Sequence, residues 1–182
     1  MNDTIIIKKA AFSLDFCNYL RNISPSEVAT VGEERVDFSV RKSNIQFFHG
    51  YLKHQKIYEP LSQCITAVNA EHFNFDIYEF ESPQLTEYDE SYQGEYKPHV
   101  DSTPVASDGF VRKLSMTIQL SPPDSYEGGE LIFPEVGGYN SSITKEQGTA
   151  IIFPSYLKHG VTPVTKGNRK SLVVWARGPQ FA

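Results

Sequence analysis

The chain has 182 residues, a formal net charge of −5 and a sequence pI near 5.5. A hydrophobic content of 40% is enough for a buried core, which excludes a disordered chain. The acidic balance argues against a nucleic-acid partner, which requires a basic face. The length fits one domain, expected over residues 1–182. The N-terminal stretch "MNDTIIIKKAAFS" is too short for a membrane span and has the wrong order of charges for a signal peptide.

The two cysteines, Cys17 and Cys64, lie far apart and outside any C-x-x-C pair. Two such thiols cannot form a disulfide framework, so they indicate a reducing compartment. We therefore expect a cytoplasmic protein that binds neither membranes nor nucleic acids, and we take it to be a monomer.

The first third of the chain carries two helical patterns. In residues 13–23 the apolar positions recur three apart, and Ser13 is a suitable N-cap. Residues 58–73 repeat apolar side chains with polar residues between them, which predicts a second helix. A charged loop lies between the two patterns and leads into a strand from about Val40.

After residue 72 the pattern changes to period two. Residues 73–80 and 114–120 alternate apolar and polar side chains, and three more short apolar runs follow between turn signals. Because the helices precede the strands instead of alternating with them, a parallel sheet is disfavoured. We predict a mainly-β protein, a double-stranded β-helix or jelly roll, with helical support over about 1–71 and the jelly-roll core over about 72–178.

The jelly-roll half contains a pair of residues with the spacing of metal ligands. His99 and Asp101, in "YKPHVDS", are two positions apart and would point the same way on a β-strand. His159 follows a buried-looking strand and is the candidate for a third ligand. Two histidines and one carboxylate form the facial triad of iron(II) sites, although manganese and zinc accept the same ligands. We expect surface or structural roles for the other histidines, His49, His54 and His72.

Arg169 lies ten residues after His159 and opens a predicted strand, where it shares a face with Ser171 and Trp175. A guanidinium that enters an apolar barrel needs a partner anion, because an unpaired buried charge is costly. No acidic residue lies nearby in sequence, whereas a dicarboxylate reaching in from the metal would provide the anion. An exposed arginine at a strand start is the alternative, and for Trp175 we favour a place in the core.

The H-x-D pair, the distal histidine and the following R-x-S resemble the iron(II)- and 2-oxoglutarate-dependent dioxygenases, within them the small bacterial and phage hydroxylases of the prolyl-4-hydroxylase-like type. Three phrases within about residues 72–178 carry the resemblance: "QLTEYDESYQGEYKPHVDS", "RKLSMTIQLSPPDSYEGGEL" and "GTAIIFPSYLKHGVTPVTKGNRKSLVVWARG". In "YEGGEL" we expect Gly128 and Gly129 to permit a tight turn or bulge. We assign no catalytic role to Glu127 or Glu130.

The resemblance implies that His99, Asp101 and His159 bind Fe(II). It also implies that Arg169 binds the far carboxylate of 2-oxoglutarate, with Ser171 and Tyr88 as further contacts. The activity implied is O2-dependent hydroxylation coupled to decarboxylation of 2-oxoglutarate to succinate and CO2, and ascorbate is expected as an additional cofactor. No side chain needs to act as a general base.

The expected substrate is a prolyl residue in a peptide or protein. The charged segment 32–43 is suited to fold over an extended chain. Tyr88, Tyr92 and Tyr96 approach the H-x-D pair, and their rings suit a proline ring. One alternative is a same-fold hydroxylase of a free amino acid or other small molecule. A non-catalytic metal-binding sensor module is the other, and O2-dependent succinate formation would exclude it.

Overall fold

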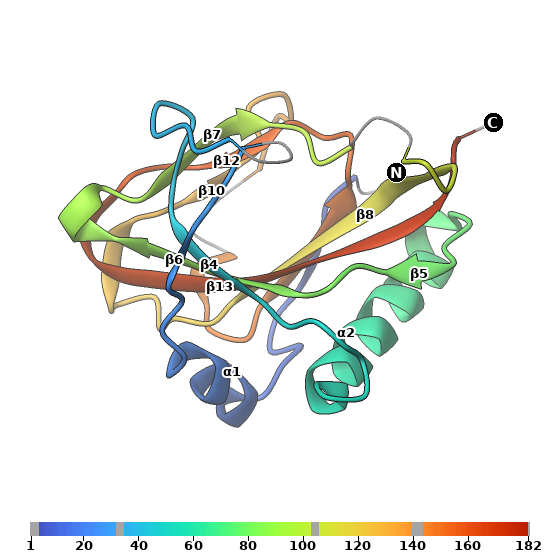
Figure 1. Cartoon of the computed structure of the whole chain (residues 1–182), viewed down its shortest axis with the longest axis horizontal. Coiled ribbons are helices and arrows are strands. Elements are labelled where there is room, and N and C mark those ends of the chain that lie inside the picture. Colours follow the sequence, from blue (N-terminus) through green and yellow to red (C-terminus); the bar gives the residue numbers. More distant parts are fainter. Residues whose placement is uncertain (1–3, 32–34, 103–105, 140–143, 182) are drawn as a thin grey trace.

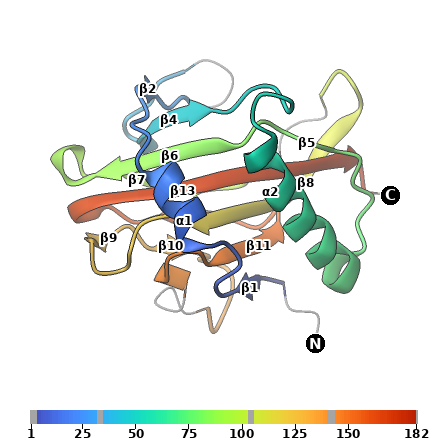
Figure 2. The same ribbon diagram turned by 90° about the horizontal axis from the view of Figure 1, so that it is seen from below.

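The computed structural model describes residues 4–31, 35–102, 106–139 and 144–181. Two antiparallel β-sheets face each other, and two α-helices cover the outer face of the larger sheet (Figure 1 and Figure 2). The smaller sheet consists of β10 (Leu131–Ile132), β12 (His159–Val161), β7 (Glu95–His99) and β3 (Arg41–Lys42). The larger sheet consists, in spatial order, of β1 (Ile6–Lys8), β11 (Ala150–Pro154), β8 (Phe110–Gln119), β13 (Val164–Pro179), β6 (Gln84–Asp89), β4 (Asn44–Phe47) and β2 (Glu27–Val28), while β5 (Glu79–Phe80) and β9 (Tyr126–Gly128) also pair with β13.

Both predicted helices form. Helix α1 (Leu14–Arg21) begins at the predicted N-cap, where the Ser13 side chain accepts a hydrogen bond from the backbone N–H of Phe16. Helix α2 (Gln55–Val68) starts slightly before the predicted pattern and buries one apolar stripe against the large sheet. In the part of the chain that the structure describes, no helix is long and apolar enough to cross a membrane.

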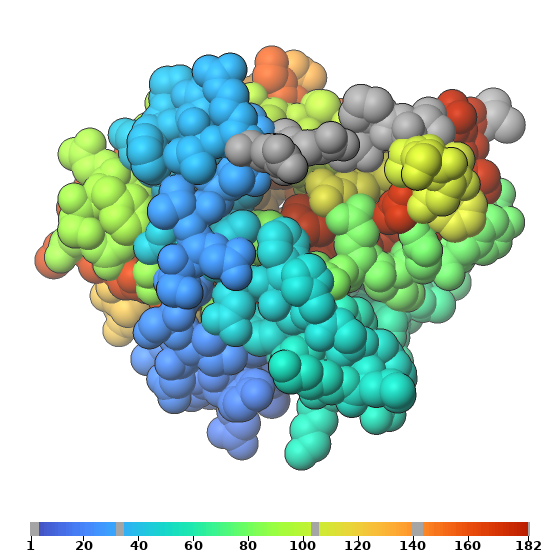
Figure 3. All heavy atoms as spheres, in the orientation of Figure 1, coloured from blue at the N-terminus to red at the C-terminus, as the bar shows by residue number. Residues whose placement is uncertain are grey.

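The first third of the chain also contributes four strands, β1 to β4, which sequence reasoning largely missed. They have two to four residues each, too few for a period-two pattern to be recognised. Their pairing with longer strands gives them their structure: β1 pairs with β11, β4 with β6 and β3 with β7. In the space-filling view, N-terminal residues, blue to cyan, cover the left and lower part of the molecule (Figure 3).

The period-two segment 73–80 is not a strand over its whole length, contrary to the prediction. It starts at the end of the π-helix η1 (Asn69–Phe73) and pairs only at β5. The Asn69 side chain instead holds the intervening backbone, with hydrogen bonds of 2.9 Å to both the N–H and the carbonyl of Phe75. The alternation still reports burial, because every second residue packs against the core: Phe73, Phe75 and Ile77.

Strand β13 separates two layers of the molecule. Side chains alternate along a strand, so Arg169 and Ser171 face the space between the sheets while Lys170 and Leu172 face the helices. The helix side forms the larger apolar core, and a smaller apolar cluster lies between the sheets. The space between the sheets is therefore where polar residues of β13 meet the smaller sheet.

The two glycines of "YEGGEL" adopt left-handed backbone conformations, with φ of +73° at Gly128 and +58° at Gly129. A Cβ at Gly129 would lie 2.9 Å from both Cδ of Arg169 and Cγ2 of Val164. The pairing of β9 with β13 also contains an irregular register at this point. The predicted bulge is confirmed, and its glycine leaves room for the arginine.

Replacing Gly129 with alanine is expected to lower the free energy of unfolding by about 1–3 kcal/mol, because the new Cβ requires a strained backbone and displaces the Arg169 side chain. Chemical denaturation measures the change. Gly137→Ala is the matched control, since nothing lies within 4 Å of its Cβ position. Equal stability of the two variants would contradict the close contact.

Candidate metal centre

The structure brings His99, Asp101 and His159 together at one end of the small sheet. His99 ends β7 and His159 begins β12, and the register of these neighbouring strands places the two histidines opposite each other. Asp101 follows β7, where its backbone N–H donates to the Ser155 carbonyl. The side chains offer one ligand atom each, and these atoms all lie within 4.8 Å of one another.

Both imidazoles are oriented by the same local hydrogen bond. Nδ1 of His99 donates to the carbonyl of Lys97 at 2.8 Å, and Nδ1 of His159 donates to the carbonyl of Leu157 at 2.9 Å. Because a carbonyl can only accept, the Nδ1 atoms carry the protons. Each ring therefore presents an unprotonated Nε2 to Asp101 in its neutral form, which is the tautomer that binds a metal.

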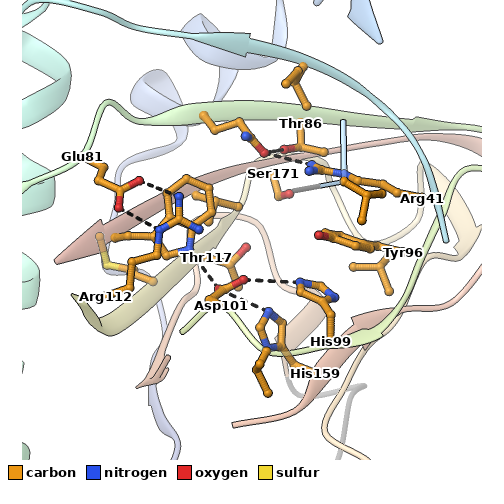
Figure 4. Close-up of a pocket in the computed structure, with 18 of the residues that line it drawn as sticks. Arg41, Glu81, Thr86, Tyr96, His99, Asp101, Arg112, Thr117, His159 and Ser171 are labelled. Carbon is orange, nitrogen blue, oxygen red and sulfur yellow. Dashed lines mark hydrogen bonds and ion pairs between the residues drawn. The ribbon is translucent and has the colours of Figure 1, made fainter. Parts of the chain in front are cut away.

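The carboxylate of Asp101 faces both rings from one side (Figure 4). Its Oδ1 is 3.3 Å from Nε2 of His99, and its Oδ2 is 3.4 Å from Nε2 of His159. Two donor atoms that are about 2.1 Å from a shared ion at right angles are about 3.0 Å apart. Each separation involves a different carboxylate oxygen, and with one ligand atom from each residue the three side chains form a group that could hold a metal ion.

Hydrogen-bond donors from two neighbouring side chains hold the Asp101 carboxylate in place. Oδ2 accepts hydrogen bonds from the Ser115 hydroxyl at 2.7 Å and from the indole N–H of Trp175 at 2.9 Å. Ser115 is in turn 2.9 Å from the hydroxyl of Ser155. These contacts occupy Oδ2, so Oδ1 is the oxygen with the more open side.

The charges of the cluster reinforce one another. Burial alone would raise the pKa of Asp101, but His159 and His99 hold it well below its usual value. Burial would lower the pKa of His159, whereas the Asp101 carboxylate and the Leu157 carbonyl raise it. The anionic form of Asp101 is therefore favoured, and a bound cation would compete with a proton for Nε2 of His159.

The cluster opens into a cavity of about 970 Å³ between the two sheets. Arg169 lines this cavity with 1% of its surface exposed, and Nη2 donates to Oε1 of Gln119 at 2.9 Å. Its Nε and Nη1 have no hydrogen-bond partner among the described residues. A buried guanidinium in a cavity wall, with two nitrogens that lack hydrogen-bond partners, is suited to bind an anion.

Two residues with hydroxyl groups line the cavity together with Arg169. Tyr88 lies opposite Arg169 on the neighbouring strand β6, and its ring centroid is 5.4 Å from Cζ of Arg169. Ser171 lines the same cavity two residues further along β13. Donors from three side chains suit a carboxylate, which accepts several hydrogen bonds at once.

Sequence reasoning missed two supporting residues and one contact of a third. Gln119 and Ser115 belong to the polar face of the segment 114–120. That polar face could have indicated supporting contacts, because polar residues on a buried strand need hydrogen-bond partners. Trp175, expected in the core, is indeed buried but also lines the cavity and donates to Asp101.

The tyrosine expectation holds for two of the three residues. Tyr88 and Tyr96 line the cavity, whereas Tyr92 lies in the short helix η2 (Glu90–Tyr92) and donates its hydroxyl to the Glu87 carbonyl. Of the predicted covering segment 32–43, residues 32–34 lie outside the described residues.

Trp175→Phe is expected to weaken metal affinity by about 10- to 100-fold, because the ring volume is largely kept while the N–H that orients Asp101 is lost. Titration of Fe(II) or Zn(II) into the variant measures the effect. Tyr19→Phe, at an exposed ring on α1, is the control. Unchanged affinity in Trp175→Phe would show that the indole does not orient the carboxylate.

Two histidines and a carboxylate that leave open positions beside a buried anion site are the arrangement of the non-haem iron(II) oxygenases. A sequence profile described as the 2OG-Fe(II) oxygenase superfamily matches residues 83–177, just over half of the chain. The chain therefore belongs to the 2OG-Fe(II) oxygenase superfamily, as the resemblance predicted.

Curated relatives match about half of the chain. A PKHD-type hydroxylase of Colwellia psychrerythraea is 39% identical over 83 residues, which are 45% of this chain and 37% of the relative. Another from Alteromonas mediterranea is 38% identical over 97 residues, covering 51% of this chain and 42% of the relative. The matched regions thus span less than half the length of these relatives.

Solved structures resemble the chain over almost its whole length. A viral collagen prolyl hydroxylase from Paramecium Bursaria Chlorella virus-1 has a TM-score of 0.73 at 19% identity, covering 97% of both chains. A Pseudomonas putida prolyl-4-hydroxylase has a TM-score of 0.70 at 18% identity, covering 97% of this chain and 94% of that chain. A Trichoplax adhaerens prolyl hydroxylase in complex with a hypoxia inducible factor peptide fragment has a TM-score of 0.69 at 17% identity, covering 95% of this chain and 83% of that chain. At these identities the likeness shows the fold, and the predicted jelly roll is confirmed.

Proposed function

We propose that this protein is an Fe(II)- and 2-oxoglutarate-dependent dioxygenase that hydroxylates a prolyl residue in a peptide or protein. One observation carries the proposal: a buried guanidinium with two nitrogens that lack hydrogen-bond partners lines the same cavity as a His-Asp-His cluster. An anion that binds a metal at one end and a guanidinium at the other joins these two features. 2-Oxoglutarate has the carboxylates at both ends that such a site requires.

In this proposal His99, Asp101 and His159 hold the iron, and Arg169, Ser171 and Tyr88 bind the far carboxylate of 2-oxoglutarate. When both are bound, they supply the oxidising chemistry, in which O2 is consumed, 2-oxoglutarate becomes succinate and CO2, and one oxygen atom is transferred to the substrate.

The protein contributes position and a dry environment. The Lys97 and Leu157 carbonyls set the tautomers of the histidines, and Ser115 with Trp175 holds the carboxylate. The apolar cluster between the sheets excludes water from the anion end of the cavity, which strengthens its hydrogen bonds. No side chain has to transfer a proton.

Three observations support a substrate beyond 2-oxoglutarate. The cavity is at the upper end of the size range of small-molecule sites, which leaves room for a second reactant. The Tyr96 ring lines the cavity and stacks on His99 at 3.6 Å, which places an aromatic side chain beside the candidate metal. The similar structures include prolyl hydroxylases, one of them with a peptide bound.

The proposal includes ascorbate as the reductant that keeps the iron reduced, and a monomeric enzyme in a reducing compartment. Cys17 and Cys64 are both free thiols in the structure, which is consistent with that compartment. The alternative substrate is a free amino acid or other small molecule, since the cavity also accommodates one.

The test is O2-dependent release of succinate with Fe(II), ascorbate and 2-oxoglutarate, screened against proline-rich peptides, lysine-containing peptides and free amino acids. Mass spectrometry should find a gain of one oxygen atom on proline. A gain confined to lysine, asparagine or a free amino acid would replace the prolyl substrate and keep the oxygenase. Absence of 2-oxoglutarate binding to the iron-loaded protein would favour the metal-binding sensor module.

A further inference from the structure

A second buried arginine lines the cavity from the small sheet. Arg41 lies on β3 beside Tyr96 of β7, and 7% of its surface is exposed. It comes from the opposite sheet to Arg169, which lies on β13. The cavity thus has one buried guanidinium on each side.

The partners of Arg41 are all neutral. Its Nε donates to the Ser43 hydroxyl at 2.9 Å, and its Nη2 donates to Oε1 of Gln84 at 2.9 Å. Nη1 has no hydrogen bond to the described residues, and no carboxylate among them forms an ion pair with Arg41. The two neutral contacts orient the guanidinium without balancing its charge.

Other arginines of the cavity wall differ in this respect. Arg112 forms a two-point contact with Glu81, at 2.8 and 2.6 Å. Arg177 pairs with Asp108 at 3.0 Å and also with Glu79. Among the described residues that line the cavity, Arg41 and Arg169 are therefore the arginines that lack a carboxylate.

Arg41 is also placed beside the candidate metal. Its Cζ lies 4.5 Å from the centroid of the Tyr96 ring. The His99 ring stacks on the opposite face of Tyr96, with the two ring centroids 3.6 Å apart (Figure 4). One aromatic ring therefore separates the guanidinium from a candidate ligand. A substrate group only a few bonds from the reacting carbon would reach Arg41.

Among the described residues that line the cavity, Arg41 is the charged group left without a counter-charge when the proposed iron and 2-oxoglutarate are bound. The two positive charges of Fe(II) and the one of Arg169 are balanced by Asp101 and the two carboxylates of 2-oxoglutarate. Glu81 balances Arg112. An unbalanced charge that is nine-tenths buried is costly, so a further anion in the cavity would be strongly stabilised.

We propose that Arg41 binds a carboxylate of the substrate, close to the carbon that is hydroxylated. This inference rests on the proposed function and deepens it, because it makes the substrate acidic. The carboxylate has two sources: an aspartate or glutamate next to the target residue in a peptide, or the main-chain carboxylate of a free amino acid or a C-terminal residue.

Matched probes distinguish these sources. Blocked peptides carry Asp or Glu, or the corresponding amides, directly before or after proline; a second pair ends in proline or in prolinamide; a third is L-proline and L-prolinamide. Binding is read from the emission of Trp175, the single tryptophan, which lies in the cavity wall. The protein is titrated anaerobically with Fe(II) and 2-oxoglutarate bound, and again without metal.

In the wild-type protein, the carboxylate member of at least one pair should bind about 10- to 100-fold more tightly than its neutral partner, the value of a charge-assisted hydrogen bond. In Arg41→Gln that preference should fall to about onefold, and Arg41→Lys should keep part of it because the charge remains. Arg35→Gln, an exposed arginine paired with Asp37 on the same segment, should keep the full preference.

Equal binding of both members of every pair by the wild-type protein overturns the inference, whether or not a variant folds. A preference that survives in Arg41→Gln also overturns it, because Arg41 would then only support the Tyr96 ring. The visible absorption of the iron–2-oxoglutarate complex separates this outcome from failure of the proposed function. If that absorption is absent in the wild type, the oxygenase proposal fails, and the metal-free titration still tests Arg41.

Discussion

Alanine at His99, Asp101 or His159 is expected to reduce succinate formation below detection. Each side chain offers one of the three ligand atoms, and no other group of three or more His, Cys, Asp or Glu side chains among the described residues could replace the site. The histidine variants should stay folded because both residues lie at strand ends. Asp101→Ala should also lose about 1–3 kcal/mol of folding stability, because two buried donors lose their acceptor.

Metal titration followed by isothermal calorimetry measures the loss of binding, and thermal unfolding monitors the fold. His49→Ala is the matched control, because His49 is exposed, hydrogen-bonds Ser82 and does not line the cavity. Near-normal turnover in any one of the three variants would show that the residue concerned is not a ligand.

Arg169→Lys is expected to retain iron and to bind 2-oxoglutarate about 10- to 100-fold more weakly, the loss of one charge-assisted hydrogen bond. The ammonium keeps the charge but cannot present two parallel N–H groups to a carboxylate. It also loses the contact with Gln119 that orients the guanidinium. Anaerobic titration of 2-oxoglutarate into the iron-loaded variant, followed by its visible absorption, gives the dissociation constant.

Arg21→Lys on helix α1 is a control for the general effect of the substitution, since that side chain does not line the cavity. A dissociation constant in Arg169→Lys equal to that of the wild type would exclude Arg169 as the carboxylate-binding residue. Loss of iron as well would indicate that the arginine supports the metal cluster instead of the co-substrate.

The part of the candidate site that could be predicted consists of residues that lie close together in the sequence. The pair His99 and Asp101 is two residues apart, and the face shared by Arg169 and Ser171 follows from strand geometry alone. His159 required one further step, because its place opposite His99 depends on the pairing of β7 with β12. The sequence suggests such long-range pairing only through the resemblance to a family.

The supporting contacts were not predictable in the same way. Trp175 and Ser115 meet at Asp101 from two different strands, and Arg41 reaches the cavity from a strand of two residues. Composition and periodicity indicate that such residues are buried, but the identity of their partners depends on sheet register. The segment 73–80 shows the same limit, since its alternation reports burial without strand pairing.

Lys170, the residue after Arg169, is also a buried cation, on the opposite face of β13. Its ammonium donates to the carbonyls of Arg21 and Ile23 at the end of helix α1 and pairs with Glu87 at 3.2 Å. The helix end thus supplies two of the acceptors that make this burial tolerable. Packing of α1 against the large sheet therefore supplies acceptors that the buried ammonium of Lys170 needs, one residue from Arg169 on the same strand.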